Sequence, residues 1–228
     1  MAVFLITGAS TGIGAATARR AKEAGYSLVL AARSEAKLKA LTDELGGGDD
    51  VLGMPCDVTR LEDQQQLFDR AVSAFGQIDV VFANAGIGAN TAGTEHGDPE
   101  EWKAMLMTNM FGVMVSAKLA IPHIKKTKGH FIITGSVAGR RTLKGSVYGA
   151  SKWGINAYGY NLREELKGTG CRVTIVEPGL VDTPFFDDPK PEGLRDDDVA
   201  RTVIFAAEQP QGVELHEIQV LPTPPLEA

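Results

Sequence analysis

Cysteine is scarce in this sequence, which contains only Cys56 and Cys171 among its 228 residues. Both lie in apolar, strand-like runs, so neither a disulfide framework nor a cysteine-bound metal is expected, and a reducing cytoplasm fits best. An excess of positive charge is also missing, since the formal net charge is −6 at pH 7 and no basic stripe appears. Because nucleic-acid-binding proteins carry such a basic surface, a nucleic-acid partner is not expected.

Long apolar runs are absent as well. No run approaches the roughly 18 residues of a membrane span, so no membrane partner is expected. The first run, residues 3–6, is too short for the core of a signal peptide, and no positive region precedes it. No linker or repeat divides the chain, so we expect one domain over residues 1–228. Its end, PTPPLEA at 222–228, continues neither a strand nor a helix and is expected to be a tail.

The sequence does contain a regular alternation of short apolar runs with longer amphipathic segments. The expected strands are residues 3–6, 27–31, 51–55, 79–83, 129–134, 172–176 and 214–220. The expected helices are residues 13–24, 35–45, 61–75, 100–125, 147–167 and 197–208. Such alternation predicts an α/β fold made of parallel βαβ units. Nearly continuous apolar strands such as VVFA further predict a sheet covered by helices on both faces.

The first expected strand leads into a glycine-rich turn, TGASTGIG at residues 7–14, which opens a helix. Glycines let the backbone turn tightly and approach a pyrophosphate, while the helix N-terminus offers free N–H groups to an anion. The turn lacks the Gly-Lys-Ser/Thr ending of a P-loop, which disfavours a nucleoside triphosphate. The alternative is a glycine-rich turn that serves only packing.

The end of the second expected strand bears on the choice of cofactor. An acidic residue at this point would bind the 2′-hydroxyl of a ribose, but here neutral Ala32 is followed by Arg33. A guanidinium suits a 2′-phosphate, so the sequence favours NADP(H) over NAD(H). The alternative is a solvated arginine at the start of a helix.

Taken in order, the motifs of this chain resemble those of the short-chain dehydrogenase/reductase family, and the resemblance covers nearly the whole chain. The matching segments are TGASTGIG at 7–14, CDV at 56–58, NAG at 84–86, Asn109 in MTNMFG, Ser136 in ITGSVAG, YGASK at 148–152, and PG at 178–179 with Thr183 beyond. The family implies a Rossmann-like, doubly wound parallel sheet of seven strands in the order 3-2-1-4-5-6-7. It commonly forms homotetramers through two long helices and the last strand, with a homodimer as the alternative.

The resemblance implies four catalytic residues, Ser136, Tyr148, Lys152 and Asn109. Residues four apart share one face of a helix, so Lys152 is expected beside Tyr148, where its ammonium lowers the phenol pKa from about 10. By family analogy Lys152 also binds the nicotinamide ribose, and Asn109 holds a water that links Lys152 to solvent. Ser136 is expected to hydrogen-bond the substrate oxygen. The set predicts metal-free acid–base chemistry on a secondary alcohol or a carbonyl, a small-molecule substrate.

The same resemblance implies the residues that bind the dinucleotide. They are Gly8, Ser10, Thr11, Gly12, Ile13, Gly14, Arg33, Ser34, Asp57, Val58, Asn84, Ala85, Gly86, Tyr148, Lys152, Pro178, Gly179, Val181 and Thr183.

Two departures from the family pattern concern the substrate pocket. The loop between Ser136 and Tyr148 is one residue shorter than in the family, and the lid, at about 180–195, is short. The pocket is expected to include residues 87–90, 137–143 and 180–186.

Several side chains near the expected pocket leave alternatives open. Arg140, Arg141 and Lys144 either attract a carboxylate substrate or, as we favour, form a solvated loop. Phe185 and Phe186 either line an apolar pocket or anchor the lid. The C-terminal HEIQVLPTP resembles family members that act on small hydroxy acids such as serine.

Two other functions compete with an alcohol or carbonyl oxidoreductase. A dehalogenase-like lyase of the same fold would replace the lysine with arginine and fill the nicotinamide space with bulky residues, whereas this chain keeps Lys152 and the small NAG and PG segments. A dinucleotide-sensing regulator would be expected to lose the Ser136, Tyr148 and Lys152 set.

Overall fold

The computed structural model describes residues 1–88, 93–143 and 145–223. A seven-stranded parallel sheet forms its centre, in the order β3-β2-β1-β4-β5-β6-β9. The strands are β1 (Val3–Thr7), β2 (Ser27–Ala32), β3 (Val51–Pro55), β4 (Val80–Ala83), β5 (His130–Thr134), β6 (Arg172–Pro178) and β9 (Glu217–Val220). The predicted fold class and strand order are confirmed. Residues 89–90 of the expected pocket, Lys144 and residues 224–228 of the expected tail lie outside the described residues.

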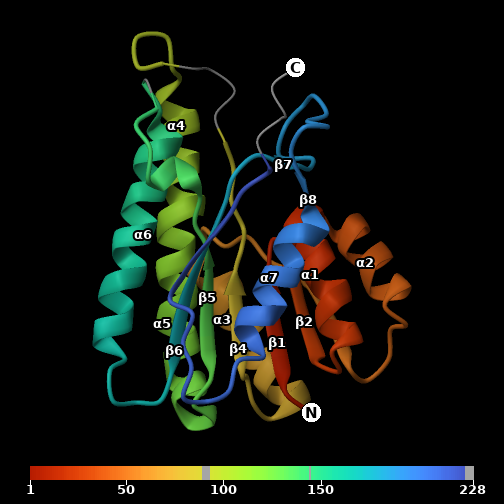
Figure 1. Ribbon diagram of the computed structural model, residues 1–228. Coiled ribbons are helices and arrows are strands. Elements are labelled where there is room, and N and C mark those ends of the chain that lie inside the picture. Colours follow the sequence, from red (N-terminus) through yellow and green to blue (C-terminus); the bar gives the residue numbers. More distant parts are fainter. Residues whose placement is uncertain (89–92, 144, 224–228) are drawn as a thin grey trace.

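Helices cover both faces of the sheet (Figure 1). One layer holds α1 (Gly12–Glu23), α2 (Glu35–Glu44) and α7 (Asp196–Ala207), and the other holds α3 (Leu61–Phe75), α5 (Gly112–Thr127) and α6 (Val147–Glu165). Two separate apolar cores result, one between each helix layer and the sheet. This three-layer arrangement is the one that the uninterrupted apolar strands predict.

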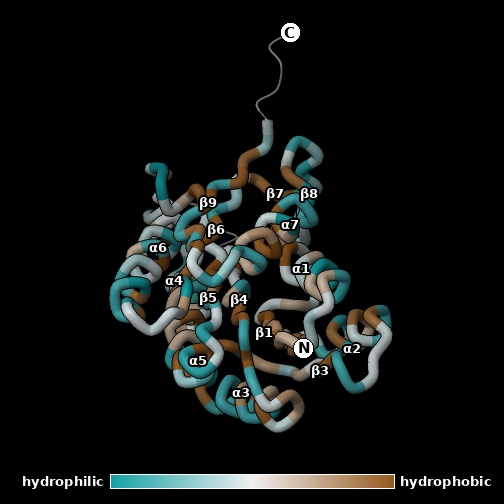
Figure 2. Tube along the Cα trace, turned by 60° about the horizontal axis from the view of Figure 1, so that its bottom comes forward, coloured by the Kyte–Doolittle hydropathy of each residue, from teal (hydrophilic) through white to brown (hydrophobic). Residues whose placement is uncertain are grey.

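The first strand shows why the sheet is buried on both sides. All five residues of β1 are buried. Side chains alternate between the faces of a strand, so Phe4 and Ile6 join the core under α1, α2 and α7, while Val3 and Leu5 join the core under α3, α5 and α6. The hydrophobic tube segments of Figure 2 accordingly run through the middle of the molecule.

The expected helix at 100–125 is divided into three parts. They are α4 (Pro99–Leu106), a π-helical turn at Met107–Phe111 and α5. By length and composition alone, the stretch Pro99–Thr127 is apolar enough to cross a membrane, but half of its most apolar window is buried inside the molecule. Because α5 packs on α3, β4 and β5, we interpret this stretch as a core helix of a soluble domain.

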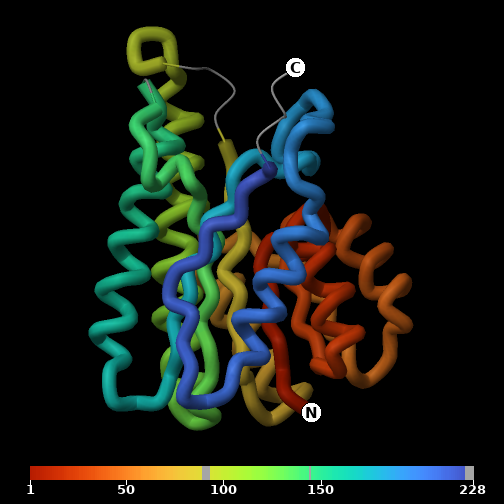
Figure 3. The backbone as a smooth tube through the Cα atoms, viewed as in Figure 1, coloured from red at the N-terminus to blue at the C-terminus, as the bar shows by residue number. Residues whose placement is uncertain are grey.

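The carboxyl ends of the strands share one edge of the sheet, where the loops after β1, β4, β5 and β6 meet (Figure 3). The segment after β6 rises over this edge and is closed at its base by a two-stranded parallel ladder, β7 (Val181–Asp182) with β8 (Leu194–Arg195). The sequence did not predict these two short strands. Ligands of open α/β sheets bind at this edge, so the fold places a site there.

Candidate active site

A cavity of about 780 Å³ opens at the carboxyl edge of the sheet. Every expected cofactor-binding residue except Gly14 lines it, as do Ser136, Tyr148 and Lys152 of the expected catalytic set. The volume lies within the range of about 300–1,000 Å³ that is typical of small-molecule sites. The cavity therefore joins the glycine-rich turn to the Tyr/Lys pair, which are far apart in the sequence.

The glycine-rich turn owes its shape to close backbone contacts. Gly8 and Gly12 have left-handed backbones, with φ of +64° and +52°, and a Cβ on Gly8 would lie 2.8 Å from the Cα of Ala85. A Cβ on Gly14 would lie 2.2 Å from the carbonyl oxygen of Gly8, so Gly14 packs under the turn rather than facing the cavity. The amide of Asn84 fixes the turn from the neighbouring strand, because its Nδ2 donates to the Gly8 oxygen at 3.2 Å.

The N-terminus of α1 has no anion of its own among the described residues. Its N-cap, Thr11, makes no side-chain cap bond, and no acidic residue lies in its first turn. By contrast, acidic side chains occupy the first turns of α2, α3, α4 and α7. Free N–H groups and the positive end of the helix dipole therefore face the cavity, which suits a phosphate group.

Two basic side chains line another part of the cavity. Arg33, Ser34 and Lys37 line the cavity beside Asp57. Burial alone would raise the pKa of Asp57, but hydrogen bonds from the backbone and hydroxyl of Thr59 hold it below its usual value. Lys37 was missed in the sequence, although it lies four residues after Arg33 in the first turn of α2, where helical spacing would have placed it nearby.

The expected catalytic side chains converge where α6 begins. Ser146 caps α6, because its Oγ accepts the Gly149 N–H at 2.9 Å, and this places Tyr148 in the first turn. Ser136 and Tyr148 both line the cavity, and hydrogen bonding from Ser136 lowers the pKa of the Tyr148 phenol. Lys152 is buried; its Nζ lies 5.7 Å from the Tyr148 ring centroid and donates to the carbonyl oxygen of Thr134 at 2.8 Å.

The ionisation of this pair differs from the expectation that Lys152 lowers the pKa of Tyr148. Burial raises the pKa of Tyr148 more than hydrogen bonding from Ser136 lowers it. Burial also lowers the pKa of Lys152, to about 8. The physical reason is that both groups lie out of water, which penalises phenolate and ammonium alike, while the ammonium is bonded to Thr134.

Comparison with known proteins agrees with this geometry. The family model described as short chain dehydrogenase matches residues 2–192. An uncharacterized oxidoreductase of Staphylococcus aureus (strain MRSA252) is 34% identical over 225 residues, which cover 96% of each chain. The chain belongs to the short-chain dehydrogenase/reductase family.

Solved structures of dehydrogenases and reductases have the same fold. An alcohol dehydrogenase from the archaeon Thermococcus sibiricus, complexed with 5-hydroxy-NADP, superposes with a TM-score of 0.89 at 30% identity, covering 100% of this chain and 99% of that one. A serine dehydrogenase complexed with NADP+ gives 0.89 at 27% identity, covering 99% and 98%. A 3-ketoacyl-(acyl-carrier-protein) reductase from Brucella melitensis, complexed with NADH, gives 0.88 at 27%, covering 96% of each chain.

Asn109 lies beside the cavity rather than in its lining. It occupies the π-helical turn, where its Oδ1 accepts the N–H of Ile87 and its Nδ2 donates to the Ile87 oxygen, both at 2.9 Å. Its Nδ2 also contacts the hydroxyl of Ser151 at 3.2 Å. The side chain thus fixes the segment after the NAG motif against α6, and its role in a water relay stays a prediction.

The lid places the aromatic ring of Phe185 against Tyr148. The rings of Phe185 and Tyr148 lie 5.7 Å apart, and a Cβ on Gly88 would lie 3.1 Å from Phe185. Phe186 meets Phe185 edge-on at 5.1 Å, and both phenylalanines line the cavity. Of the two alternatives for these residues, the apolar pocket wall is the one that the structure favours.

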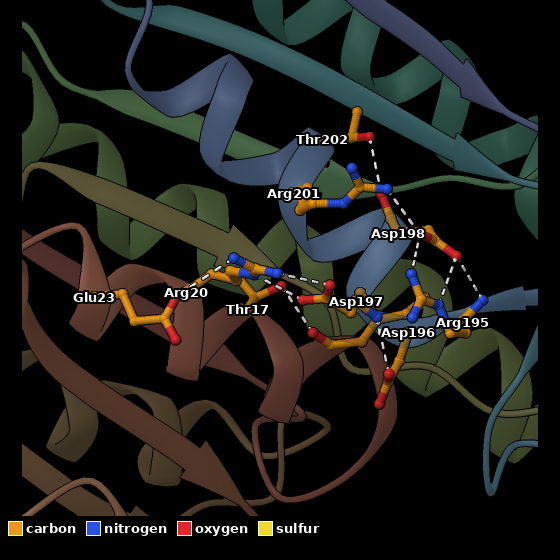
Figure 4. Close-up of polar contacts among 10 residues, drawn as sticks. Thr17, Arg20, Glu23, Arg195, Asp196, Asp197, Asp198, Arg201 and Thr202 are labelled. Carbon is orange, nitrogen blue, oxygen red and sulfur yellow. Dashed lines mark hydrogen bonds and ion pairs between the residues drawn. The ribbon is translucent and has the colours of Figure 1, made fainter.

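Ion pairs fix the far end of the lid, where α7 begins (Figure 4). Asp198 accepts the Arg195 backbone N–H at 3.0 Å and its guanidinium at 3.2 Å, which closes the first turn of α7. Arg20 of α1 donates to both carboxylate oxygens of Asp197 at 2.7 Å. Helix α7, which follows the lid, is therefore bonded to α1, which begins at the glycine-rich turn.

The basic loop after Ser136 departs from both sequence interpretations at one residue. Arg140 neither faces the cavity nor is solvated, because its Nε donates to buried Glu177 at 2.8 Å and its Nη2 contacts Glu217. Arg141 is exposed and does not line the cavity. The Arg140 ion pairs could not be predicted from the sequence, because the partners of Arg140 follow it by 37 and 77 positions.

Proposed function

We propose that this short-chain dehydrogenase is an NADP(H)-dependent oxidoreductase that interconverts a secondary alcohol and a ketone or aldehyde. One observation carries the proposal: Ser136, Tyr148 and buried Lys152 line one cavity, which begins at the uncapped end of α1. The Ser136 hydroxyl, the Tyr148 phenol and the Lys152 ammonium together can donate a proton beside the part of the cavity that suits a dinucleotide.

The described residues fit a phosphorylated dinucleotide. The N-terminus of α1 offers free N–H groups for the pyrophosphate, and Asp57 lies where an adenosine is expected. Arg33, Ser34 and Lys37 supply two cations and a hydroxyl for a 2′-phosphate, which supports NADP(H) over NAD(H). Lys152 uses one of its three N–H donors on Thr134, and the others suit ribose hydroxyls.

Side chains of the protein carry out the proton transfer. A bound nicotinamide would supply the hydride that the carbonyl carbon receives in reduction and would accept it from the carbinol carbon in oxidation. In reduction, the Tyr148 hydroxyl delivers its proton to the carbonyl oxygen, which becomes the alcohol hydroxyl. Ser136 donates a hydrogen bond to the same oxygen as its negative charge develops. The ammonium of Lys152 stabilises the phenolate that remains, and the reverse steps give oxidation.

The ionisation of the site favours reduction near neutral pH. Because burial raises the pKa of Tyr148, the phenol keeps its proton and is ready to act as an acid. Lys152, with a pKa of about 8, is still charged below that pH and opposes the negative charge of the phenolate. Both states are those that the donation of a proton to a carbonyl requires.

A small substrate with an apolar part fits the described wall of the pocket. Phe185 packs on Tyr148 and Phe186 packs on Phe185, while Arg140 is held by carboxylates and cannot receive a substrate carboxylate. The segment HEIQVLPTP resembles family members that act on small hydroxy acids, and its residues Glu217–Val220 form β9. Small hydroxy acids and their keto forms therefore belong in a substrate panel with simple ketones and aldehydes.

Assembly and location complete the proposal. Exposed apolar side chains lie on the long helices, among them Leu106, Phe111 and Trp153, the last with half of its surface exposed. Such faces suit the helix–helix contacts of a homotetramer or homodimer. Both cysteines, Cys56 and Cys171, are free thiols, which suits a reducing cytoplasm.

A substrate panel and a cofactor titration test the proposal together. Ketones, aldehydes and hydroxy acids are supplied with NADPH or NADP+, and turnover is followed by NADPH absorbance. NADPH is expected to bind more tightly than NADH, and Arg33→Ala to lower NADPH affinity about tenfold, about 1.4 kcal/mol, with little effect on NADH. Tighter binding of NADH than of NADPH, or an unchanged NADPH affinity in Arg33→Ala, would contradict the proposed cofactor preference. A lack of turnover across the whole panel would contradict the proposed reaction.

A further inference from the structure

The polar face of α6 continues beyond the Tyr/Lys pair. Asn156 and Tyr160 follow Tyr148 and Lys152 at steps of four residues, so all four lie along one side of the helix. Asn156 is 1% exposed, although a buried amide is costly unless it is bonded. Asn156 lies one helical turn after Lys152, and it takes no part in the proton transfer proposed for Ser136, Tyr148 and Lys152.

Asn156 lies against both glycines of the Ser136 loop. A Cβ on Gly135 would lie 2.8 Å from the Asn156 Oδ1 and 3.1 Å from Glu177, and a Cβ on Gly139 would lie 2.6 Å from the Asn156 Nδ2. The Asn156 Nδ2 also donates to the Gly139 oxygen at 3.4 Å. The loop that carries Ser136 therefore rests directly on this amide and on the side chain of Glu177.

Glu177 is a fully buried carboxylate that gathers donors from three other elements. Its Oε1 accepts from the Arg140 Nε at 2.8 Å and the Asn156 Nδ2 at 2.5 Å, and its Oε2 accepts from the Gln219 Nε2 at 3.2 Å. The next two residues, Pro178 and Gly179, line the cavity. The carboxylate thus joins the Ser136 loop, α6 and β9 to the segment expected to meet the nicotinamide.

Arg140 closes the network on its outer side. Its Nη2 contacts the hydroxyl of Tyr160 and the carboxylate of Glu217, and the Tyr160 hydroxyl donates to Glu217 at 2.8 Å. One guanidinium therefore faces two carboxylates, one of them buried. Burial and the neighbouring Glu217 raise the pKa of Glu177 to about 7, while Arg140 opposes that rise. Removing Arg140 leaves this pair of carboxylates without a cation.

We propose that Arg140 and Glu177 are positioning residues, which act through Asn156 to hold Ser136 and the Pro178-Gly179 segment at fixed places against α6. This inference rests on the proposed function, because it assigns the network to the reaction at Tyr148. Hydroxyl donors must be held within a fraction of an ångström for proton transfer, so a loosened Ser136 loop slows the chemical step more than it weakens cofactor binding.

The test compares two arginines that both connect α6 with the segment around β9. Arg140→Met removes the guanidinium of the network and keeps an apolar stem of similar length. Arg163→Met is the matched control, because Arg163 of α6 donates to Glu214 at 2.6 Å and pairs with Glu164, and among the described residues no bond joins it to the Ser136 loop. Glu177→Gln keeps the shape of the carboxylate without its charge, and Arg140→Lys keeps the cation without the planar fork.

For Arg140→Met and Glu177→Gln we expect kcat to fall at least about tenfold, with the Kd of NADPH within about twofold of the wild type. Arg140→Lys is expected to recover part of kcat, and Arg163→Met to keep kcat while Tm falls. An increase in substrate KM alone in Arg140→Met would show contact with substrate, and unchanged kcat would show a structural bond only; either result overturns the inference. A wild-type enzyme that turns over no carbonyl or alcohol contradicts the proposed function as well, whereas an active wild type with an equally active Arg140→Met contradicts this inference alone.

Discussion

Burial acts on two neighbouring side chains, Tyr148 and Lys152, by making each of them prefer its uncharged form. The tyrosine and the lysine were recognisable in the sequence from their spacing, but their ionisation was not. It depends on the surroundings that β5, the Ser136 loop and the lid create, and on the carbonyl of Thr134 that receives the ammonium. The pH at which the enzyme works is therefore a property of the folded site.

This ionisation predicts the pH dependence of carbonyl reduction. Lys152 carries its charge below a pKa of about 8 and loses it above, so stabilisation of the Tyr148 phenolate is lost as pH rises through that value. We expect kcat/KM for NADPH, which reports on groups of the free enzyme, to be level between pH 6 and 7 and to fall above about pH 8. The measurement is the initial rate of NADPH oxidation across this range, and a rate that rises through pH 8 would contradict the account.

At the scale of elements, the sequence predicted the regular parts of the fold and missed its interruptions. Periodicity located every strand of the main sheet and every helix that covers it, because most of them bury a continuous apolar face, although the edge strands β3 and β9 are only partly buried. It could not show the π-helical turn at Met107–Phe111, which depends on Asn109 bonding to Ile87, nor the short β7 and β8, which are two residues each. These features depend on contacts between distant segments.

The same limit explains what was missed in the site. Motif spacing found Ser136, Tyr148 and the glycine-rich turn, since each follows or opens a regular element. It did not find that Arg140 is bonded to Glu177, because nothing in the local sequence marks an ion pair between a loop and a strand 37 positions away. The sequence indicated the cofactor preference through Ala32 and Arg33, whereas the contribution of Lys37 became clear only from the structure, in which it lines the cavity.

The lid offers a prediction for an element of the structure. Phe185 packs on Tyr148 and over Gly88, and an aromatic pair contributes about 0.5–1.5 kcal/mol beyond the area it buries. Phe185→Ala is therefore expected to raise the KM of an apolar ketone about three- to tenfold, with the Kd of NADPH unchanged. Phe205→Ala is the control, because that ring lies on α7, is 59% exposed and does not line the cavity. Equal KM values in the two variants would argue against an apolar wall at Phe185.

At the scale of the whole molecule, two buried groups give opposite pH dependences of stability. His130 is fully buried, with its Nε2 at 2.7 Å from the Thr174 hydroxyl and no partner for its Nδ1 in the described part of the chain. Burial and Arg172 lower its pKa well below 6.5, so its contribution to stability is lost as pH falls below about 6.5. The pKa of Glu177 is raised from 4.5 to about 7, so its contribution is lost as pH rises through that window.

Replacing the histidine separates the two effects. As pH falls from 7.5 to 5.5, the wild type is expected to lose stability relative to His130→Gln. The difference in their free energies of unfolding changes by up to about 1.4 kcal/mol for each pH unit below pH 6.5. A constant offset at pH 7.5 does not affect this comparison, because the slope is what is measured. Urea unfolding at several pH values checks it, and parallel pH profiles for the two proteins would show that His130 does not titrate differently on folding.

We propose that Tyr148 is the proton donor of an NADPH-dependent carbonyl reductase. The most direct test is kcat of Tyr148→Phe with the best carbonyl substrate, measured beside the Kd of NADPH and beside Tyr158→Phe, a control on the same helix outside the cavity. Loss of a positioned acid costs about 10²–10⁴ in rate, so we predict a fall of at least about a hundredfold in Tyr148→Phe with NADPH still bound. A Tyr148→Phe enzyme that keeps most of its activity would contradict the account.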